Sequence, residues 1–176
     1  MINYNISFIG GIHGVGKTTF CKLLTERMGY LHYSASSLIK EYKNLKKDKK
    51  VDKVNENQDI LITAIKKTFN IQNNYILDGH FCLLDTKNQI IEVPFSTFKT
   101  LNLKKIIVLK DSSCNIHEKL LKRDGINYDI DLIEDFQNRE LSYSKKIANL
   151  LNIPYKVFDI HSDIDEVINF ITSLID

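Results

Sequence analysis

A glycine-rich loop between a short apolar strand and a helix is the feature that most constrains this chain. Residues 9–19 read IGGIHGVGKTT and follow the apolar run NISFI at 5–9. The next segment, 17–28, has apolar residues at helical spacing and is followed by a glycine. A loop of this pattern, between a strand and a helix, is typical of phosphate-binding (Walker A) sequences. It predicts an α/β fold that begins with a strand–loop–helix unit.

The residue types in this loop suit phosphate binding. Glycines at positions 11, 14 and 16 let the backbone curve around phosphate oxygens, so that consecutive N–H groups point inward. The helix that follows adds the positive end of its dipole. We expect Lys17 to reach the β- and γ-phosphates and the Thr18 hydroxyl to bind Mg²⁺, so the predicted cofactors are ATP and Mg²⁺. The predicted cofactor-binding residues are Gly11, Gly14, Val15, Gly16, Lys17, Thr18 and Thr19.

Strands alternate with helices along the rest of the chain. We expect four further strands, at 30–34, 74–79, 104–111 and 154–160. The later helices are expected at 35–44, 55–69, 115–123, 131–151 and in the C-terminal segment, where Asp163 is the expected N-cap. This alternation predicts a single domain over 1–176, a three-layer α/β/α sandwich around a parallel sheet. The strand ends at 10–19, 34–40, 78–82 and 111–113 should then converge at one edge of the sheet.

The segment YILDGHF places two candidate residues at the end of a strand. We expect Asp78 to face the glycine-rich loop, where it would take part in catalysis and hold Mg²⁺ through a water. The alternative is an Asp-Gly turn that serves geometry alone. His80 has three open roles, as an acid–base group, as a residue that orients water, or as a packing partner of Phe81. His13, inside the loop, is expected to contribute only through its backbone.

Arginine is scarce, which makes each arginine informative. Of the 24 Lys and Arg residues, three are arginine. Arg123 and Arg139 lie 16 residues apart, at the end of one expected helix and inside the next. Guanidinium groups match phosphate geometry, so both are candidate catalytic residues on a short lid over about 123–139. The alternative is that both are solvated helix residues, and Arg27 is expected to be a surface residue.

This ordered set of motifs resembles the nucleoside monophosphate kinases, and within that group the archaeal-type adenylate kinases. The likeness spans nearly the whole chain. It rests on the loop, Asp78-Gly79-His80, the strand LNLKKIIVLK, Arg123-Asp124 and Asn138-Arg139. The resemblance implies a P-loop NTPase fold whose parallel sheet has five strands in the order 2-3-1-4-5, with a short lid. It also implies Mg·ATP as donor and a nucleoside monophosphate as acceptor.

The acceptor side departs from the family pattern in two places. The segment SSLIKEY resembles the family's G-D-L-L-R, with Lys40 in place of the arginine. The segment DGHFC is similar to D-G-F-P-R, but Cys82 occupies the arginine position. The resemblance therefore implies acceptor-side helices over about 34–70, with Ser37, Lys40 and His80 as acceptor-binding residues. Gln58, on the second of these helices, is a less favoured contact to a base.

Composition narrows the classes of partner and compartment. The three cysteines lie far apart without a CxxC pair, which supports neither a disulfide framework nor a zinc site. No apolar run approaches the roughly 20 residues of a membrane helix, and the first residues do not read as a signal peptide. We therefore expect a cytoplasmic protein with no membrane partner.

Charge gives no strong argument for a nucleic-acid partner, because the formal net charge is +2. Residues 40–50, however, contain six lysines. They would attract an anionic acceptor, including an RNA end, or they form a solvated face, which is the more common use of such a run.

These observations favour an enzyme, a nucleotide kinase that moves the terminal phosphoryl group of Mg·ATP to a nucleoside monophosphate. One alternative is an ATPase switch or regulatory protein that closes on nucleotide and binds a partner. Another is a kinase of a different acceptor, such as a nucleoside, a small metabolite or a polynucleotide end. No short motif identifies the acceptor base or the oligomeric state.

Overall fold

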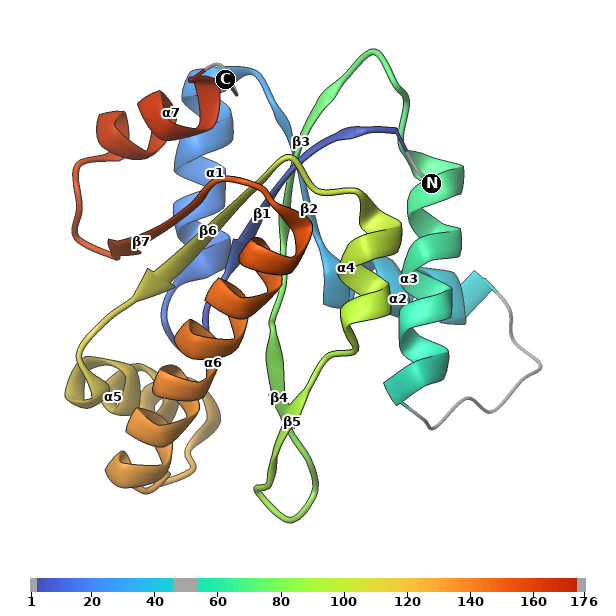
Figure 1. Ribbon diagram of the computed structural model, residues 1–176. Helices are drawn as coiled ribbons and strands as arrows, with labels where there is room; N and C mark the ends of the chain where they lie inside the picture. The colour runs from blue at the N-terminus through green and yellow to red at the C-terminus, as the bar shows by residue number, and fades with distance from the viewer. Residues whose placement is uncertain (1–2, 46–53, 174–176) are drawn as a thin grey trace.

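The computed structural model describes residues 3–45 and 54–173, and its central element is a parallel sheet of five strands (Figure 1). The strands are β1 (Asn5–Gly10), β2 (Leu31–Ser34), β3 (Asn74–Asp78), β6 (Lys105–Lys110) and β7 (Tyr155–Asp159). They lie in the order β2-β3-β1-β6-β7. Numbered along the chain within this sheet, the order is 2-3-1-4-5. The predicted fold class is confirmed.

Strand register brings the ends of the central strands level. Ile9 of β1 pairs with Asp78 of β3, and Ser34 of β2 pairs with the same residue. The glycine-rich loop after β1 therefore starts beside the segment that follows β3. In sheets of this kind, ligands bind beyond the carboxyl ends of the strands, and the register places two candidate segments there together.

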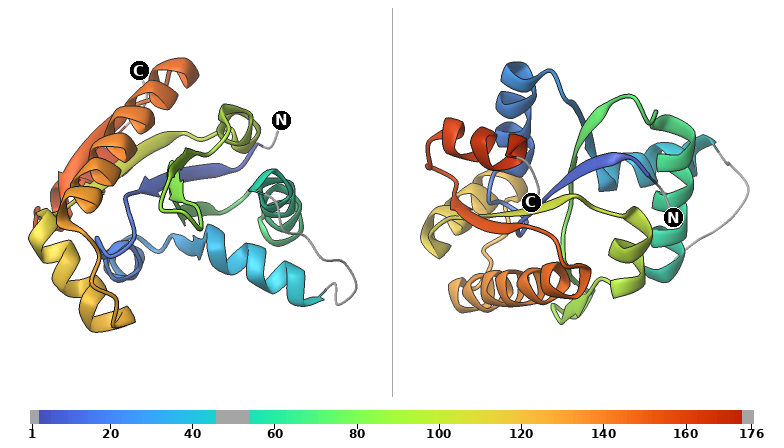
Figure 2. Two further views of the ribbon diagram at one scale, coloured as in Figure 1. Left: turned by 90° about the horizontal axis from the view of Figure 1, so that it is seen from below. Right: turned by 45° about the horizontal axis from the view of Figure 1, so that its top comes forward.

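Helices cover both faces of the sheet (Figure 2). They are α1 (Lys17–Met28), α2 (Ala35–Leu45), α3 (Val54–Thr68), α4 (Phe95–Leu101), α5 (Ser113–Asp124), α6 (Ile130–Leu151) and α7 (Ile164–Thr172). Helices α1 and α7 contact each other, α4 and α6 contact each other, and α2 packs against α3. Asp163 caps α7 by accepting a hydrogen bond from the Asp165 N–H, as its sequence position predicted.

Three phenylalanine rings fix the segment after β3 against β1. The Phe81 ring lies 5.1 Å from the Phe8 ring and 4.8 Å from the Phe98 ring, measured between centroids. A Cβ on Gly10 would lie 2.5 Å from the Phe81 ring. Close packing thus requires a glycine at Gly10, immediately before the phosphate loop.

A short antiparallel hairpin was not predicted from the sequence. It consists of β4 (Cys82–Leu84) and β5 (Ile90–Glu92). Its strands are too short to show an alternating pattern, but its turn has a recognisable chemistry. The Asp85 carboxylate accepts hydrogen bonds from the Lys87 and Gln89 N–H groups, and Asn88 has a φ of 59°. The sequence DTKN at 85–88 was the available signal.

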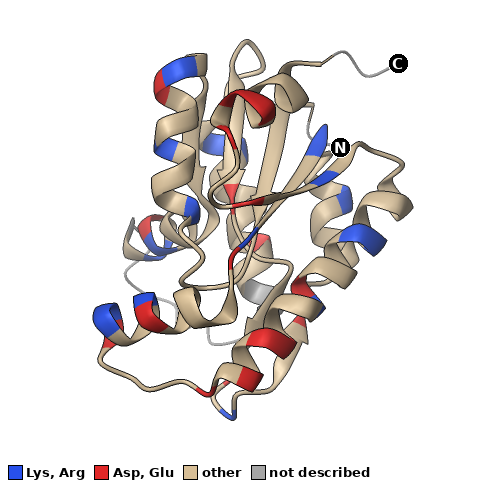
Figure 3. Ribbon diagram, turned by 90° about the vertical axis from the view of Figure 1, so that its left-hand side faces the viewer, with Lys and Arg blue, Asp and Glu red and all other residues tan. Residues whose placement is uncertain are grey.

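Charged residues of both signs occur on the helices in the view of Figure 3. Of the lysine-rich stretch, Lys40 and Lys43 lie on α2, whereas Lys46, Lys47, Lys49 and Lys50 lie outside the described residues. The attraction of an RNA end to this stretch therefore stays a prediction. Among the described helices, none is both long and apolar enough to cross a membrane.

Candidate functional site

The loop between β1 and α1 has the backbone conformation that the sequence predicted. Gly11, Gly14 and Gly16 have φ values of 141°, 84° and 107°, which side chains rarely allow. A Cβ on Gly14 would also lie 2.7 Å from the Leu120 side chain. Gly16 is the N-cap of α1 and supplies no side-chain hydrogen bond, so the first N–H groups of the helix need partners from elsewhere. This is the arrangement that binds phosphate.

Lys17 is held inside the loop. Its side chain donates to the Gly11 carbonyl at 2.6 Å and to the Ile12 carbonyl at 3.1 Å, and the residue is 7% exposed. Burial lowers the pKa of Lys17 to about 8, although Glu140 and Asp78 oppose this shift. The ammonium group therefore lies where the phosphates of a nucleotide in the loop would meet it. Thr18 and Thr19 are exposed at the start of α1.

A buried carboxylate, Glu140, was missed in the sequence. Glu140 is 1% exposed and accepts hydrogen bonds from the N–H groups of Gly11 at 2.9 Å, Phe81 at 3.0 Å and Cys82 at 2.6 Å. Burial raises the pKa of Glu140, while these donors and Lys17 oppose the rise. The carboxylate joins the phosphate loop to the segment after β3. The Gly11 N–H is thus bonded to Glu140, and nucleotide binding by Gly11 stays a prediction.

Helical periodicity was the signal for Glu140. The apolar positions of α6 include Ile133, Phe136, Tyr143 and Ile147, which are buried. Glu140 falls on the same stripe, so it is an acidic residue on the core face of an amphipathic helix. A carboxylate at such a position must be hydrogen-bonded or paired, which marks it as a candidate for a structural or functional role.

Asp78 is the last residue of β3 and is tied to β2. Its Oδ2 lies 2.6 Å from Nε2 of His32, and its side chain is 5% exposed. Cys21 lies beside them, with one ligand atom from each of the three residues within 4.8 Å of the others. Mg²⁺ prefers oxygen ligands, so Asp78 and Thr18 suit it, whereas the sulfur of Cys21 and the imidazole of His32 do not. Mg²⁺ binding by Thr18 and Asp78 stays a prediction.

A pocket of about 100 Å³ lies beside Asp78. It is called the acceptor-side pocket because residues of α2 and α3, the helices predicted to lie on the acceptor side, contribute to its lining. Most of its wall is apolar and includes Phe8, Leu61 and Phe98. Its polar lining residues are Ser34, Ser36, Gln58, Asp78, His80 and Thr97. Two predicted acceptor residues, Ser37 and Lys40, are exposed on α2 and do not line the pocket in the described structure. The neighbour Ser36 lines it instead, because adjacent helical residues face different directions.

His80 connects this pocket to the phosphate loop. Its ring lies 4.0 Å from the His13 ring, measured between centroids. Its Nδ1 is buried and has no hydrogen-bond partner among the described residues. Burial, followed by the charge of Lys17, lowers the pKa of His80 well below its ordinary value. The His13 ring packs against His80, and the expectation that His13 contributes to binding only through its backbone stays a prediction.

A second, lid-side pocket of about 340 Å³ adjoins the other flank of the loop. It is lined by His13, Arg123, Tyr128 and Phe136, among others. Arg123 is held by Asp124, to which it donates two hydrogen bonds at 2.6 and 2.7 Å.

Arg139 has a different environment. Its guanidinium pairs with Glu92 of β5 at 2.6 Å, and it lines neither pocket in the described structure. The structure thus places one of the two predicted lid arginines beside the loop and the other against the hairpin.

Most of the chain matches the model of a known protein family. The model of the family described as "AAA domain" matches residues 10–137, from the phosphate loop into α6. The chain belongs to the AAA domain family.

Two solved structures are similar to this AAA domain. One is a gluconokinase from Sinorhizobium meliloti 1021, with 12% identity, a TM-score of 0.55, and 97% of this chain and 91% of that chain covered. The other is an uncharacterized protein from Eubacterium ventriosum ATCC 27560, with 15% identity, a TM-score of 0.52 and coverages of 97% and 99%. A search of curated proteins found no match. These likenesses show a P-loop kinase fold, and the narrower likeness to archaeal-type adenylate kinases stays a prediction.

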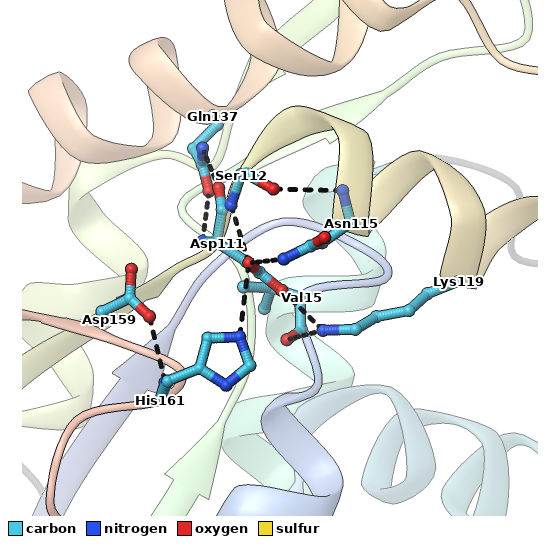
Figure 4. Close-up of polar contacts among 8 residues, drawn as sticks. All are labelled: Val15, Asp111, Ser112, Asn115, Lys119, Gln137, Asp159 and His161. Carbon is cyan, nitrogen blue, oxygen red and sulfur yellow. Dashed lines mark hydrogen bonds and ion pairs between the residues drawn. The ribbon is translucent and has the colours of Figure 1, made fainter.

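A polar cluster at the end of β6 supports the loop of this AAA domain (Figure 4). The Asp111 carboxylate accepts hydrogen bonds from Lys119 at 2.7 Å, Asn115 at 2.8 Å and the Ser112 N–H at 2.7 Å. Lys119 also donates to the Val15 carbonyl at 3.5 Å. Burial acts to raise the pKa of Asp111, but the hydrogen bonds from Lys119, Asn115 and Ser112 outweigh it and hold the pKa below its ordinary value. The segment after β6 therefore meets the phosphate loop, as predicted.

We expect Glu140→Ala to lower the free energy of unfolding by about 3 kcal/mol or more, because it leaves three buried N–H groups unpaired. Urea unfolding measures the change. Glu134→Ala is the matched control, since Glu134 is exposed on the same helix and its loss should cost about 0.5 kcal/mol or less. Equal losses in the two variants would contradict the role given to Glu140.

Asp111→Asn should reveal a pH-dependent contribution to stability. A carboxyl whose pKa is lower in the folded state stabilises the fold above its unfolded pKa, and this stabilisation is lost as pH falls through the folded pKa. At pH 7 the wild type should therefore unfold at a higher urea midpoint than Asp111→Asn. The difference between the two midpoints should become smaller as pH falls below about 4. Asp135→Asn, an exposed site on α6, should show no such narrowing. A gap that is constant with pH would argue against this role.

Proposed function

We propose that the protein transfers the terminal phosphoryl group of Mg·ATP to a small acceptor bound in the acceptor-side pocket. The observation that carries this proposal is the juxtaposition of two sites. A phosphate loop with an intact Lys17 and Thr18 lies next to a separate pocket, and Asp78 and His80 lie between them. A protein that only held ATP would not need a second pocket at this point. The P-loop kinase fold supports the same reading.

The chain's own residues would act mainly by position and charge, as is usual in phosphoryl transfer. Lys17 would bind the transferring phosphoryl group after leaving the loop carbonyls. Thr18 and Asp78 would hold Mg²⁺, which supplies charge neutralisation at the phosphates when bound. Arg123, beside the loop, would stabilise charge that develops during transfer.

The sequence predicts a nucleoside monophosphate as acceptor, which would make the protein an adenylate kinase-like enzyme. That prediction rests on the order of the motifs along the chain. The pocket itself supports a small acceptor.

Acceptor-dependent formation of ADP from Mg·ATP tests the proposal. We expect ADP to form faster with at least one acceptor than with water alone, across a panel of nucleoside monophosphates, nucleosides and uncharged sugars. Lys17→Ala should abolish the difference, because it removes the charge that binds the phosphates. It also serves as the control for contaminating kinases. If ADP forms at the same rate with every acceptor as with water alone, the result would favour the ATPase switch instead.

Removal of the lid arginines tests the second part of the proposal. We expect Arg123→Ala to lower kcat by about 100-fold or more, with a much smaller effect on the KM for ATP. Arg139→Ala should act in the same direction but less, since Glu92 holds this guanidinium. Arg27→Ala is the control, because Arg27 pairs with Asp165 of α7. Wild-type turnover in Arg123→Ala would remove Arg123 from the catalytic residues.

A further inference from the structure

We propose that the acceptor is a compact, uncharged molecule that presents a hydroxyl group, rather than a nucleoside monophosphate. This inference rests on the proposed phosphotransfer and narrows it. It follows from the composition and size of the acceptor-side pocket, together with the position of Asp78 in its wall.

The charges in the pocket wall oppose an anionic acceptor. Its described lining residues include the carboxylate of Asp78 and contain neither lysine nor arginine. Lys40, the cation that the sequence offered for an acceptor phosphate, is exposed on α2 and outside this wall. A phosphate here would face a carboxylate, and none of the described residues that line the pocket carries a compensating guanidinium. Like charges at close range are unfavourable. Cys82, at the family's arginine position, is buried and supplies no charge at neutral pH, because burial raises its pKa to about 12.

The size of the pocket argues for a compact molecule. Its volume is about 100 Å³, well below the roughly 300–1,000 Å³ of pockets for drug-sized ligands. Apolar side chains form most of the wall, and the side chains of Ser34, Ser36 and Gln58 supply neutral hydrogen-bonding groups. Neutral donors and acceptors on an apolar surface fit hydroxyl groups attached to a carbon skeleton.

Two histidines fix the polar end of this pocket. His32 holds Asp78 by a hydrogen bond of 2.6 Å, so the carboxylate is oriented before an acceptor binds. His80 lines the pocket and has a buried Nδ1 without a partner among the described residues. A buried polar atom of this kind costs free energy unless a ligand satisfies it, and an acceptor hydroxyl would do so.

The chemical step balances with these groups alone. The acceptor hydroxyl oxygen forms a bond to the γ-phosphorus of ATP, and the bond from that phosphorus to the β,γ-bridging oxygen breaks. The hydroxyl proton passes to an oxygen of the transferred phosphoryl group, and ADP leaves with the bridging oxygen. The products are ADP and a phosphate monoester of the acceptor.

Matched pairs of acceptors test the inference. Each uncharged compound is paired with its own phosphate ester: ribose with ribose 5-phosphate, glucose with glucose 6-phosphate, and adenosine and cytidine with their 5′-monophosphates. Transfer of the γ-phosphoryl group of radiolabelled Mg·ATP is measured for both members. We expect product from an uncharged member at a rate at least about tenfold above that of its phosphate ester.

The other outcomes separate the two proposals. Faster transfer to the phosphate esters would overturn the hydroxyl acceptor and leave the phosphotransferase intact. Label released as inorganic phosphate, with no transfer to any compound, would overturn the proposed function as well.

Two adjacent residues of α3 give a test at the pocket itself. Gln58 lines the pocket, whereas the neighbouring Asp59 is exposed and outside it. We expect Gln58→Ala to raise the KM for the best uncharged acceptor about fivefold, the loss of one neutral hydrogen bond, with the KM for ATP unchanged. Asp59→Ala should change neither value. Equal acceptor KM values in the two variants would remove this pocket as the acceptor site.

Discussion

The site depends on the hydrogen bonds that the buried carboxylate of Glu140 accepts. The carboxylate binds the N–H of Gly11, and the ammonium of Lys17 binds the carbonyl of the same residue. The N–H and the carbonyl of Gly11 are thus bound by two side chains of opposite charge. Both side chains are buried, and burial of either charge alone would carry a large desolvation cost. The same carboxylate accepts hydrogen bonds from the N–H groups of Phe81 and Cys82, so the phosphate loop and the segment after β3 share one support.

The features of the fold that the sequence predicts are those whose physical cause is local in the chain. The glycines of the loop, the five sheet strands and the cap at Asp163 follow from conformational freedom, apolar patterning and a short-range hydrogen bond. Glu140 could not be placed in the same way, since its partners at positions 11, 81 and 82 lie more than fifty residues away along the chain. Its position on the apolar stripe of α6 is a signal of burial but does not identify what it binds.

Helical phase explains why the pocket wall contains Ser36 and not Ser37, the residue predicted from the sequence. Ser36 and Ser37 are equivalent as residue types, but successive helical positions differ by about 100° in direction. Both residues are exposed, but Ser36 lines the pocket and Ser37 does not. A comparison of SSLIKEY with the family motif matches residue types position by position. The direction of each side chain depends instead on how α2 packs against α3. Lys40 likewise lies on α2 outside the lining of this pocket, and acceptor binding by Ser37 and Lys40 stays a prediction.

The β4–β5 hairpin separates the two pockets beside the phosphate loop. Leu83 lines the acceptor-side pocket, and the next residue, Leu84, lines the lid-side pocket. Alternate side chains of a strand point to opposite sides, so three residues of β4 form a partition with one face toward each pocket. The boundary between the two pockets is therefore set by the pleat of a strand, and the linings on its two sides can change independently of each other.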